Sequence, residues 1–263
     1  LIPTYTPLRT DEADVSLERI FYGGINVFLQ QKWSLFRHTP RLLDRPLDHP
    51  SLLKMLSRFS ASTSAADLGE LTVSVLNGEE GHQKKELARL AQWLRNEFKP
   101  DLIHLTNSMF VGMSRELKET VGVPVLCGLQ GEDIFLEGLP EPYKAQAKNV
   151  LRKRAQDADA FIAPCQYYRD YMAAYMAVDA EKIHVVHLGL HLEGHGEKPR
   201  TESTPPRIGY LARICPEKGF HLLVEAFRIL SDEWGAGELH LDVAGYLGGR
   251  DRSYFDEQVK RIE

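Results

Sequence analysis

The stretch that decides the fold is Arg207-Ile-Gly-Tyr-Leu-Ala-Arg213-Ile-Cys-Pro-Glu217-Lys218-Gly219-Phe-His-Leu-Leu-Val-Glu-Ala226. Its apolar start predicts a short strand, and its end predicts an amphipathic helix. The loop between them carries Arg213, Lys218 and a glycine. A strand that leads into a helix N-terminus presents unpaired backbone N–H groups and a partial positive charge, which favours an anion such as a diphosphate. The stretch therefore predicts an anion-binding loop in an α/β fold.

The same alternation of strands and helices runs through the rest of the sequence. Apolar runs predict strands at 102–105, 124–128, 160–163, 183–188, 207–211 and 239–244. Periodic patterns predict helices within 65–98, at 167–176 and at 219–231, with a break near Asn77 and Gly78. Near-continuous apolar strands between helices indicate parallel sheets covered on both faces. The polar segment 193–206 is typical of a linker, so we expect two α/β domains.

Composition limits the classes of partner. The chain has 263 residues and a net charge of -5, which excludes the broad basic surface of a nucleic-acid-binding protein. Its three cysteines are far apart and form no metal-binding spacing, which favours a reducing compartment. No apolar run is long enough to span a bilayer, and no signal peptide opens the sequence. We therefore expect a cytoplasmic protein.

Both ends of the sequence suggest a fragment. There is no initiator Met, residues 1–7 read as a strand already under way, and residues 252–263 read as a helix with no stop signal. We expect the chain to be cut at both ends, with the first strand and loop of the first domain missing.

The loop from Arg213 to Gly219 resembles the start of the donor-binding domain in GT4-type retaining glycosyltransferases of GT-B fold. The alternative interpretation is a surface Arg and Lys beside an ordinary helix start. The resemblance implies two Rossmann-like doubly wound domains that face a cleft. It assigns residues 1–192 to an acceptor-side domain, 193–206 to the linker, and 207–263 to the incomplete start of a donor-binding domain.

The resemblance also implies roles for residues of the second domain. Arg213 and Lys218 would hold the diphosphate of a nucleotide sugar and act in catalysis, because preorganised cations stabilise charge that develops on the leaving group. The other donor-binding candidates are Gly209, Glu217, Gly219 and Gly245. Gly245 follows a predicted strand and would let the backbone approach a ligand closely.

Two segments of the first domain are candidates for the acceptor side. Gln130, Gly131, Glu132 and Asp133 follow a predicted strand, at the edge where open α/β sheets bind ligands. Relatives commonly carry His where this chain has Gln130, and a glutamine cannot act as an acid or base. The alternative is a polar turn that caps the next helix. Gly23 and Gly24 resemble a glycine-rich acceptor loop, with a plain helix entry as the alternative.

The implied function is transfer of a sugar from a nucleotide-diphosphate sugar to an acceptor hydroxyl with retention of configuration. Such enzymes usually need no metal, so we expect no metal site and no cofactor besides the donor. The acceptor would be a sugar, a lipid or a small molecule, and the resemblance leaves peripheral membrane contact open. The family's two donor-binding glutamates would lie beyond Glu263, so we expect the chain to be inactive alone.

Two other functions remain open at this point. A sugar-nucleotide epimerase of the same architecture would release a free epimerised sugar in place of a glycoside. A non-catalytic nucleotide-sugar-binding protein would lack the downstream glutamates and any turnover of the donor. A Rossmann dehydrogenase is disfavoured, because no Gly-x-Gly-x-x-Gly follows a strand with an acidic residue at the expected distance.

Overall fold

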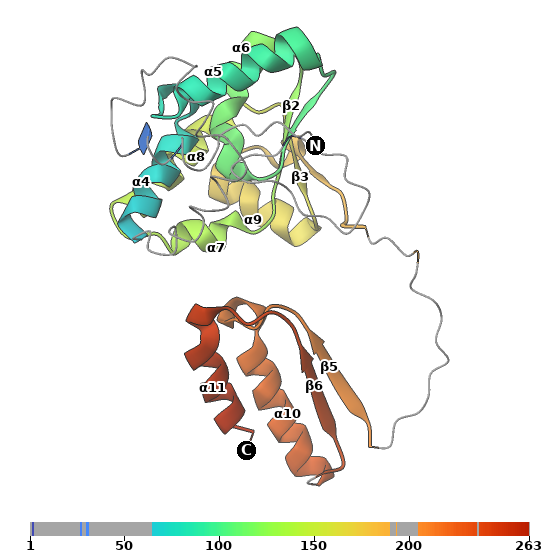
Figure 1. Ribbon diagram of the computed structural model, residues 1–263. Coiled ribbons are helices and arrows are strands. Elements are labelled where there is room, and N and C mark those ends of the chain that lie inside the picture. The colour runs from blue at the N-terminus through green and yellow to red at the C-terminus, as the bar shows by residue number, and fades with distance from the viewer. Residues whose placement is uncertain are drawn as a thin grey trace. The chain divides into compact units, whose positions relative to one another are not determined.

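The computed structural model describes residues 65–189, 205–235 and 237–262, together with Ile2, Val27, Gln30, Gln31 and Glu193. The chain divides into two compact units, Leu1–Leu190 and His191–Glu263. Each unit contains parallel strands that alternate with helices (Figure 1). The α/β class predicted from the sequence is confirmed.

The first unit is built on a four-stranded parallel sheet in the order β1-β2-β3-β4. The strands are β1 (Ile103–Leu105), β2 (Val125–Gly128), β3 (Ala160–Ala163) and β4 (Ile183–Val185). The prediction that the last strand reaches Leu188 is wrong, since the ladder ends at Val185 and Leu188 is 84% exposed. Because all four strands are parallel, their carboxyl ends lie at one edge, where open α/β sheets bind ligands.

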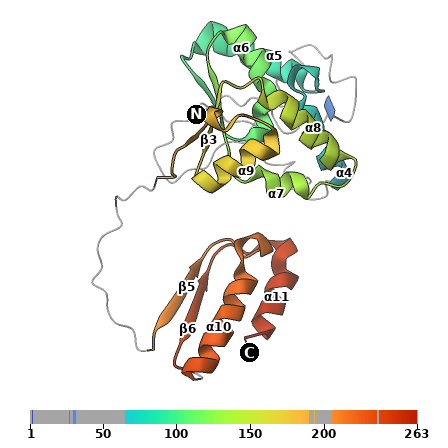
Figure 2. The ribbon, with the colours of Figure 1, turned by 180° about the vertical axis from the view of Figure 1, so that it is seen from behind.

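Helices precede and connect these strands. Residues 65–98 form α4 (Ala65–Leu76) and α5 (Lys84–Trp93), separated by a 3₁₀ turn at Gly78–Glu80, as predicted, and followed by a π-helical turn at Leu94–Phe98. The connections contain a 3₁₀ segment, η5 (Ser108–Met113), then α6 (Ser114–Val121), α7 (Glu132–Glu137), α8 (Tyr143–Ala155), α9 (Gln166–Met176) and a turn at Ala180–Lys182. Helices α7 and α9 lie side by side in both views (Figures 1 and 2).

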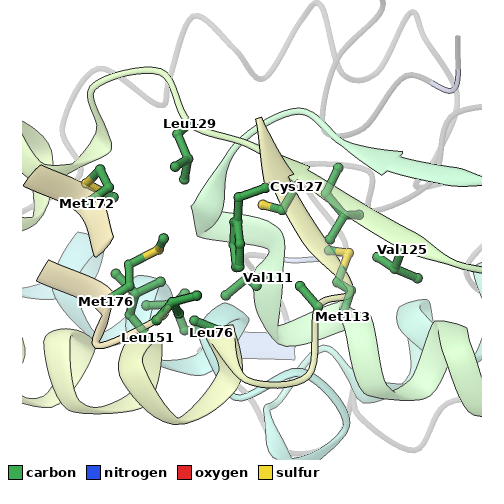
Figure 3. Packing of buried hydrophobic residues seen from close by; sticks show 14 of the residues in the cluster. Leu76, Val111, Met113, Val125, Cys127, Leu129, Leu151, Met172 and Met176 are labelled. Atoms are coloured by element: carbon green, nitrogen blue, oxygen red, sulfur yellow. The ribbon is translucent and has the colours of Figure 1, made fainter. Parts of the chain in front are cut away.

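The core of the first unit lies between the sheet and these helices. Leu151 of α8 and Met176 of α9 are fully buried and belong to the same cluster as Leu76, Val111 and Cys127 (Figure 3). Continuous apolar strands and the small alanines of α8 allow this close packing. The core thereby fixes the strand ends from which the candidate site is built.

One buried charge joins α8 to the end of α4. Arg154 has no exposed side-chain surface, and it pairs with Glu79 at 2.7 Å and donates to the carbonyl oxygen of Asn77 at 2.6 Å. Asp157 and Glu80 lie within 3.6 Å of the same guanidinium. A buried cation needs several acceptors, because the transfer of an unpaired charge from water into the core costs much free energy.

The second unit has two parallel strands, β5 (Arg207–Leu211) and β6 (His240–Ala244). A 3₁₀ turn (Pro216–Lys218) and α10 (Phe220–Trp234) connect them, and a turn at Gly249–Asp251 precedes α11 (Arg252–Lys260). Both helices lie on one face of the strand pair (Figure 2). Phe220 and Val224 of α10 form a small core with Ile214, against which Tyr210 and Phe255 pack. The predicted strand–loop–helix pattern of this region is confirmed.

Candidate functional site

The loop between β5 and α10 holds both predicted phosphate-binding cations. Arg213 follows the end of β5, and Lys218 ends the 3₁₀ turn directly before Gly219. Both side chains are exposed. Arg213 Nη2 lies 4.0 Å from the Glu217 carboxylate, whereas Lys218 forms no ion pair within the described part of the chain. The loop therefore presents two cations and one carboxylate to solvent.

Two neighbouring side chains bind this loop from inside. Arg213 Nε donates to Cys215 Sγ at 3.2 Å, and the Tyr210 hydroxyl lies 3.2 Å from the carbonyl oxygen of Arg213 and 3.4 Å from that of Lys218. The hydrogen bond with Cys215 raises the pKa of the Arg213 guanidinium, and the Glu217 carboxylate adds to this shift. The cation at Arg213 is thus held by its own loop.

The helix N-terminus differs from the sequence-based prediction. The backbone N–H of His221, in the first turn of α10, donates to the Tyr254 hydroxyl at 2.9 Å. The backbone N–H groups of Leu222 and Leu223 both donate to the carbonyl oxygen of Gly219. The expectation of unpaired N–H groups is therefore wrong for these three residues, because Tyr254 of α11 accepts one of the N–H groups and the Gly219 carbonyl oxygen accepts the other two. Anion binding at this loop therefore depends more on the Arg213 and Lys218 side chains than on the backbone N–H groups of α10.

Backbone geometry explains why glycine is present at two of the candidate positions of the second unit, and it does so differently at each. Gly219 adopts the left-handed conformation (φ 69°) that joins the 3₁₀ turn to α10, which favours glycine. At Gly245, a Cβ atom would lie 1.8 Å from the Ala212 carbonyl oxygen, so glycine is needed there for backbone packing between the two loops. Gly209 lies within β5, where a Cβ would meet nothing within 4 Å.

In the first unit, the four acceptor-side candidates gather at the carboxyl end of β2. Glu132, the first residue of α7, is 9% exposed and accepts the backbone N–H of Ser108 at 2.9 Å and of Gln130 at 2.8 Å. It thereby joins the loops that follow β1 and β2. This geometry gives Glu132 a structural role, which agrees with the alternative interpretation of this segment as a polar turn. Gln130 is exposed, and its amide donates to the Thr106 carbonyl oxygen at 2.9 Å.

Sequence reasoning missed Tyr168 as a member of this site. Its hydroxyl accepts the backbone N–H of Gly131 at 2.8 Å and donates to Asp133 Oδ1 at 2.7 Å. Burial raises the pKa of the Tyr168 hydroxyl, and its hydrogen bond to Asp133 raises it further. Tyr168 lies in the first turn of α9, which follows β3, the neighbour of β2. The adjacency of β2 and β3 could have indicated that Tyr168 lies beside the Gln130–Asp133 loop.

Gly23 and Gly24 lie outside the described residues. Among the residues that the structure does describe, no group of three or more His, Cys, Asp or Glu side chains is arranged to hold a metal ion. Within the same residues, no helix is both long and apolar enough to cross a membrane.

Comparison with known proteins agrees with the geometry of the first unit. Residues 66–193 match the family model Glycosyltransferase Family 4. This segment is similar to glycosyltransferase family 4. The matched segment contains all four strands that the structure describes in the first unit, and the Gln130–Asp133 loop. The resemblance to GT4-type enzymes, which rested mainly on the loop at Arg213, is thereby confirmed from a different part of the chain.

A solved structure shows the same fold. The crystal structure of Anabaena Alr3699/HepE in complex with UDP is similar to this chain with a TM-score of 0.52 and 17% sequence identity. The match covers 70% of this chain and 50% of that one, so the chain spans about half the length of HepE. The predicted GT-B type of α/β architecture is confirmed. No curated protein sequence matches the chain.

Proposed function

We propose that this protein takes part in transfer of a sugar from a nucleotide-diphosphate sugar to an acceptor hydroxyl, with retention of configuration. The family 4 match and the likeness to a structure that contains UDP support this class of reaction. The observation that carries the proposal is the pair Arg213 and Lys218, two exposed cations in one short loop between a parallel strand and a helix.

The chemistry of the donor explains why two cations are needed. As the bond from the sugar carbon C1 to the diphosphate oxygen breaks, negative charge develops on the leaving diphosphate. Arg213 and Lys218, held in place before the reaction, stabilise this charge without reorganisation. They supply positive charge to the phosphate oxygens, so the proposed reaction needs no metal cofactor.

The acceptor belongs at the carboxyl edge of the first sheet. Gln130 and Asp133 offer hydrogen-bonding groups there, and neither Gln130 nor the buried Glu132 is suited to act as a general base. The acceptor proton then passes to the departing phosphate oxygen as the new bond to C1 forms on the same face. We assign residues 1–192 to the acceptor, 207–263 to the donor, and 193–206 to the linker.

The acceptor is a sugar, a lipid or a small molecule with a free hydroxyl, and we propose that the protein acts in the cytoplasm without nucleic acid. The three cysteines are free thiols, which suits a reducing compartment.

The test replaces both cations in the full-length gene product. Wild type and the variant Arg213→Ala/Lys218→Ala are incubated with UDP-sugars and other nucleotide sugars, and release of nucleoside diphosphate is measured with EDTA present. We expect loss of about 100- to 1,000-fold in kcat for each cation removed, by analogy with other preorganised donors. The matched control is Arg228→Ala, which removes an exposed arginine from α10.

Three outcomes contradict the proposal. Turnover that survives both substitutions nearly intact excludes the diphosphate role of the loop. A free epimerised sugar in place of a glycoside indicates an epimerase. A product of inverted configuration excludes retention.

A further inference from the structure

The loop that carries Arg213 and Lys218 is braced from inside by two side chains to which the proposed reaction gives no role. Cys215 lies between the two cations in sequence and is fully buried. Tyr210 lies on β5, and its ring packs against Phe220 with 5.4 Å between ring centroids. Neither residue is charged, so neither can itself neutralise a phosphate. Each is nevertheless bound to a cation or to its backbone.

Cys215 fixes the direction of the Arg213 side chain. The contact joins Nε to Sγ at 3.2 Å, so it leaves the terminal nitrogens Nη1 and Nη2 for other partners. Arg side chains have many rotamers, and holding one in place before a ligand arrives removes part of the entropic cost of binding. The carbonyl oxygen of Cys215 also accepts the backbone N–H of Lys218 at 3.1 Å. One residue therefore contacts both cations, one through its side chain and one through its backbone.

Tyr210 fixes the backbone at both cations. Its hydroxyl lies within hydrogen-bond reach of two carbonyl oxygens, that of Arg213 at 3.2 Å and that of Lys218 at 3.4 Å. A hydroxyl has one proton, which these two acceptors share. The six residues from Arg213 to Lys218 are thereby closed into a tight turn, and both of its ends are bound by one side chain of β5.

We propose that Cys215 and Tyr210 are positioning residues, which hold Arg213 and Lys218 in the arrangement that binds the donor diphosphate. This inference rests on the proposed function of the same loop. Both residues act through the cations, so their removal should weaken the binding of an anion and slow turnover without removing any group that contacts it.

The test for Cys215 uses three substitutions of similar size. Cys215→Ser keeps an acceptor for Arg213 Nε, whereas Cys215→Ala and Cys215→Val remove it. In the full-length gene product, we expect Ala and Val to weaken the binding of UDP and of inorganic diphosphate about tenfold, and Ser to restore binding to within about threefold of wild type. Thermal unfolding is measured for each variant. If Ser weakens binding as much as Ala and Val, the acceptor role is wrong.

A double-mutant cycle separates positioning from a general packing effect. Lysine lacks Nε, so in an Arg213→Lys background the change Cys215→Ala should have no further effect on diphosphate binding. An equal loss in both backgrounds means that Cys215 does not act through Arg213 and overturns its role.

The test for Tyr210 removes only the hydroxyl. We expect Tyr210→Phe to weaken diphosphate binding about threefold to tenfold, because both carbonyl contacts are lost while the ring packing remains. The control is Tyr167→Phe, a hydroxyl deletion at a side chain of the first unit that is 76% exposed, which should leave diphosphate binding unchanged. If Tyr210→Phe binds diphosphate like the control, its positioning role is wrong.

The same binding assay distinguishes failure of the proposed function from failure of the positioning role. If Arg213→Ala and Lys218→Ala leave the binding of UDP and diphosphate unchanged, the proposed function of the loop fails. If these two variants lose binding while Cys215→Ala and Tyr210→Phe keep it, the proposed function stands and the positioning inference fails.

Discussion

At the residue scale, Glu132 is the clearest case in which a candidate ligand has a structural task. Its carboxylate accepts two backbone N–H groups, from Ser108 and Gln130, and it is almost fully buried. We predict that Glu132→Ala lowers the free energy of unfolding of the first unit by about 3 kcal/mol, because both donors lose their partner. Urea denaturation followed by circular dichroism measures this change.

A matched control lies on the same helix. Glu137 is 42% exposed and pairs with Lys148 at 2.8 Å, so Glu137→Ala should cost less than about 1 kcal/mol. Equal losses in the two variants contradict the structural role of Glu132.

Sequence alone could place Glu132 after a strand but could not orient its oxygens. The donors come from residues 108 and 130, and Tyr168 completes the cluster from a third segment. Such a constellation depends on the order of the strands, which a linear pattern does not contain. The loop at Arg213 was easier to predict, because its strand, cations, glycine and helix are consecutive.

At the element scale, two glycines let α4 and its following turn lie against η5. A Cβ on Gly112 would lie 2.1 Å from the Leu76 carbonyl oxygen, and one on Gly78 would lie 1.9 Å from the Gly112 oxygen. We predict that Gly112→Ala lowers the free energy of unfolding by about 3 kcal/mol, because backbone cannot move aside as a flexible side chain can. Gly189→Ala, where a Cβ meets nothing within 4 Å, is the control in the same denaturation experiment. Similar stabilities of the two variants would contradict this contact.

Acid sensitivity is expected where α6 and β2 meet the start of β3. Burial acts to raise the pKa of Asp159, but its bonds to the Lys118 ammonium at 2.6 Å and to the Val125 N–H at 2.8 Å outweigh it. The pKa of Asp159 therefore lies below its ordinary value of 3.8. Its contribution to stability is present above that value and is lost as the pH falls through the lowered pKa.

We predict that wild type is more stable than Asp159→Asn at neutral pH and that the difference shrinks as the pH falls below 3.8. Urea midpoints measured from pH 7 down to pH 3 test this. A difference that stays constant over this range would mean that the charge of Asp159 does not contribute.

The helices that sequence reasoning did not predict have a physical explanation. In α8, the buried residues are Ala147, Leu151, Arg154 and Ala155, so the inward face contains a charged residue and two small ones. The apolar periodicity that indicates a helix is hidden when a buried arginine supplies part of the core face. The strands, in contrast, were predicted well because each contains a short run dominated by apolar residues and flanked by turns.

At the scale of the whole molecule, the two units have separate hydrophobic cores. Leu151 belongs to the first and Val224 to the second, and each is fully buried. We predict two unfolding transitions in calorimetry, because cores without shared residues need not melt together. Leu151→Ala should lower the free energy of unfolding of the first unit alone, by about 2–5 kcal/mol. Val224→Ala should lower that of the second unit alone. A single transition that both substitutions shift equally contradicts independent units.

The distribution of the thiols has a practical consequence. Cys127 and Cys215 are fully buried, burial raises the pKa of Cys127 well above its ordinary range, and Cys165 is partly exposed. A maleimide dye at neutral pH should therefore attach first at Cys165, in the loop that joins β3 to α9. This position follows β3, the neighbour of β2, and Gln130 lies in the loop that follows β2. The sequence thus contains a cysteine at which a fluorescent label would report ligands that bind near the carboxyl edge of the first sheet.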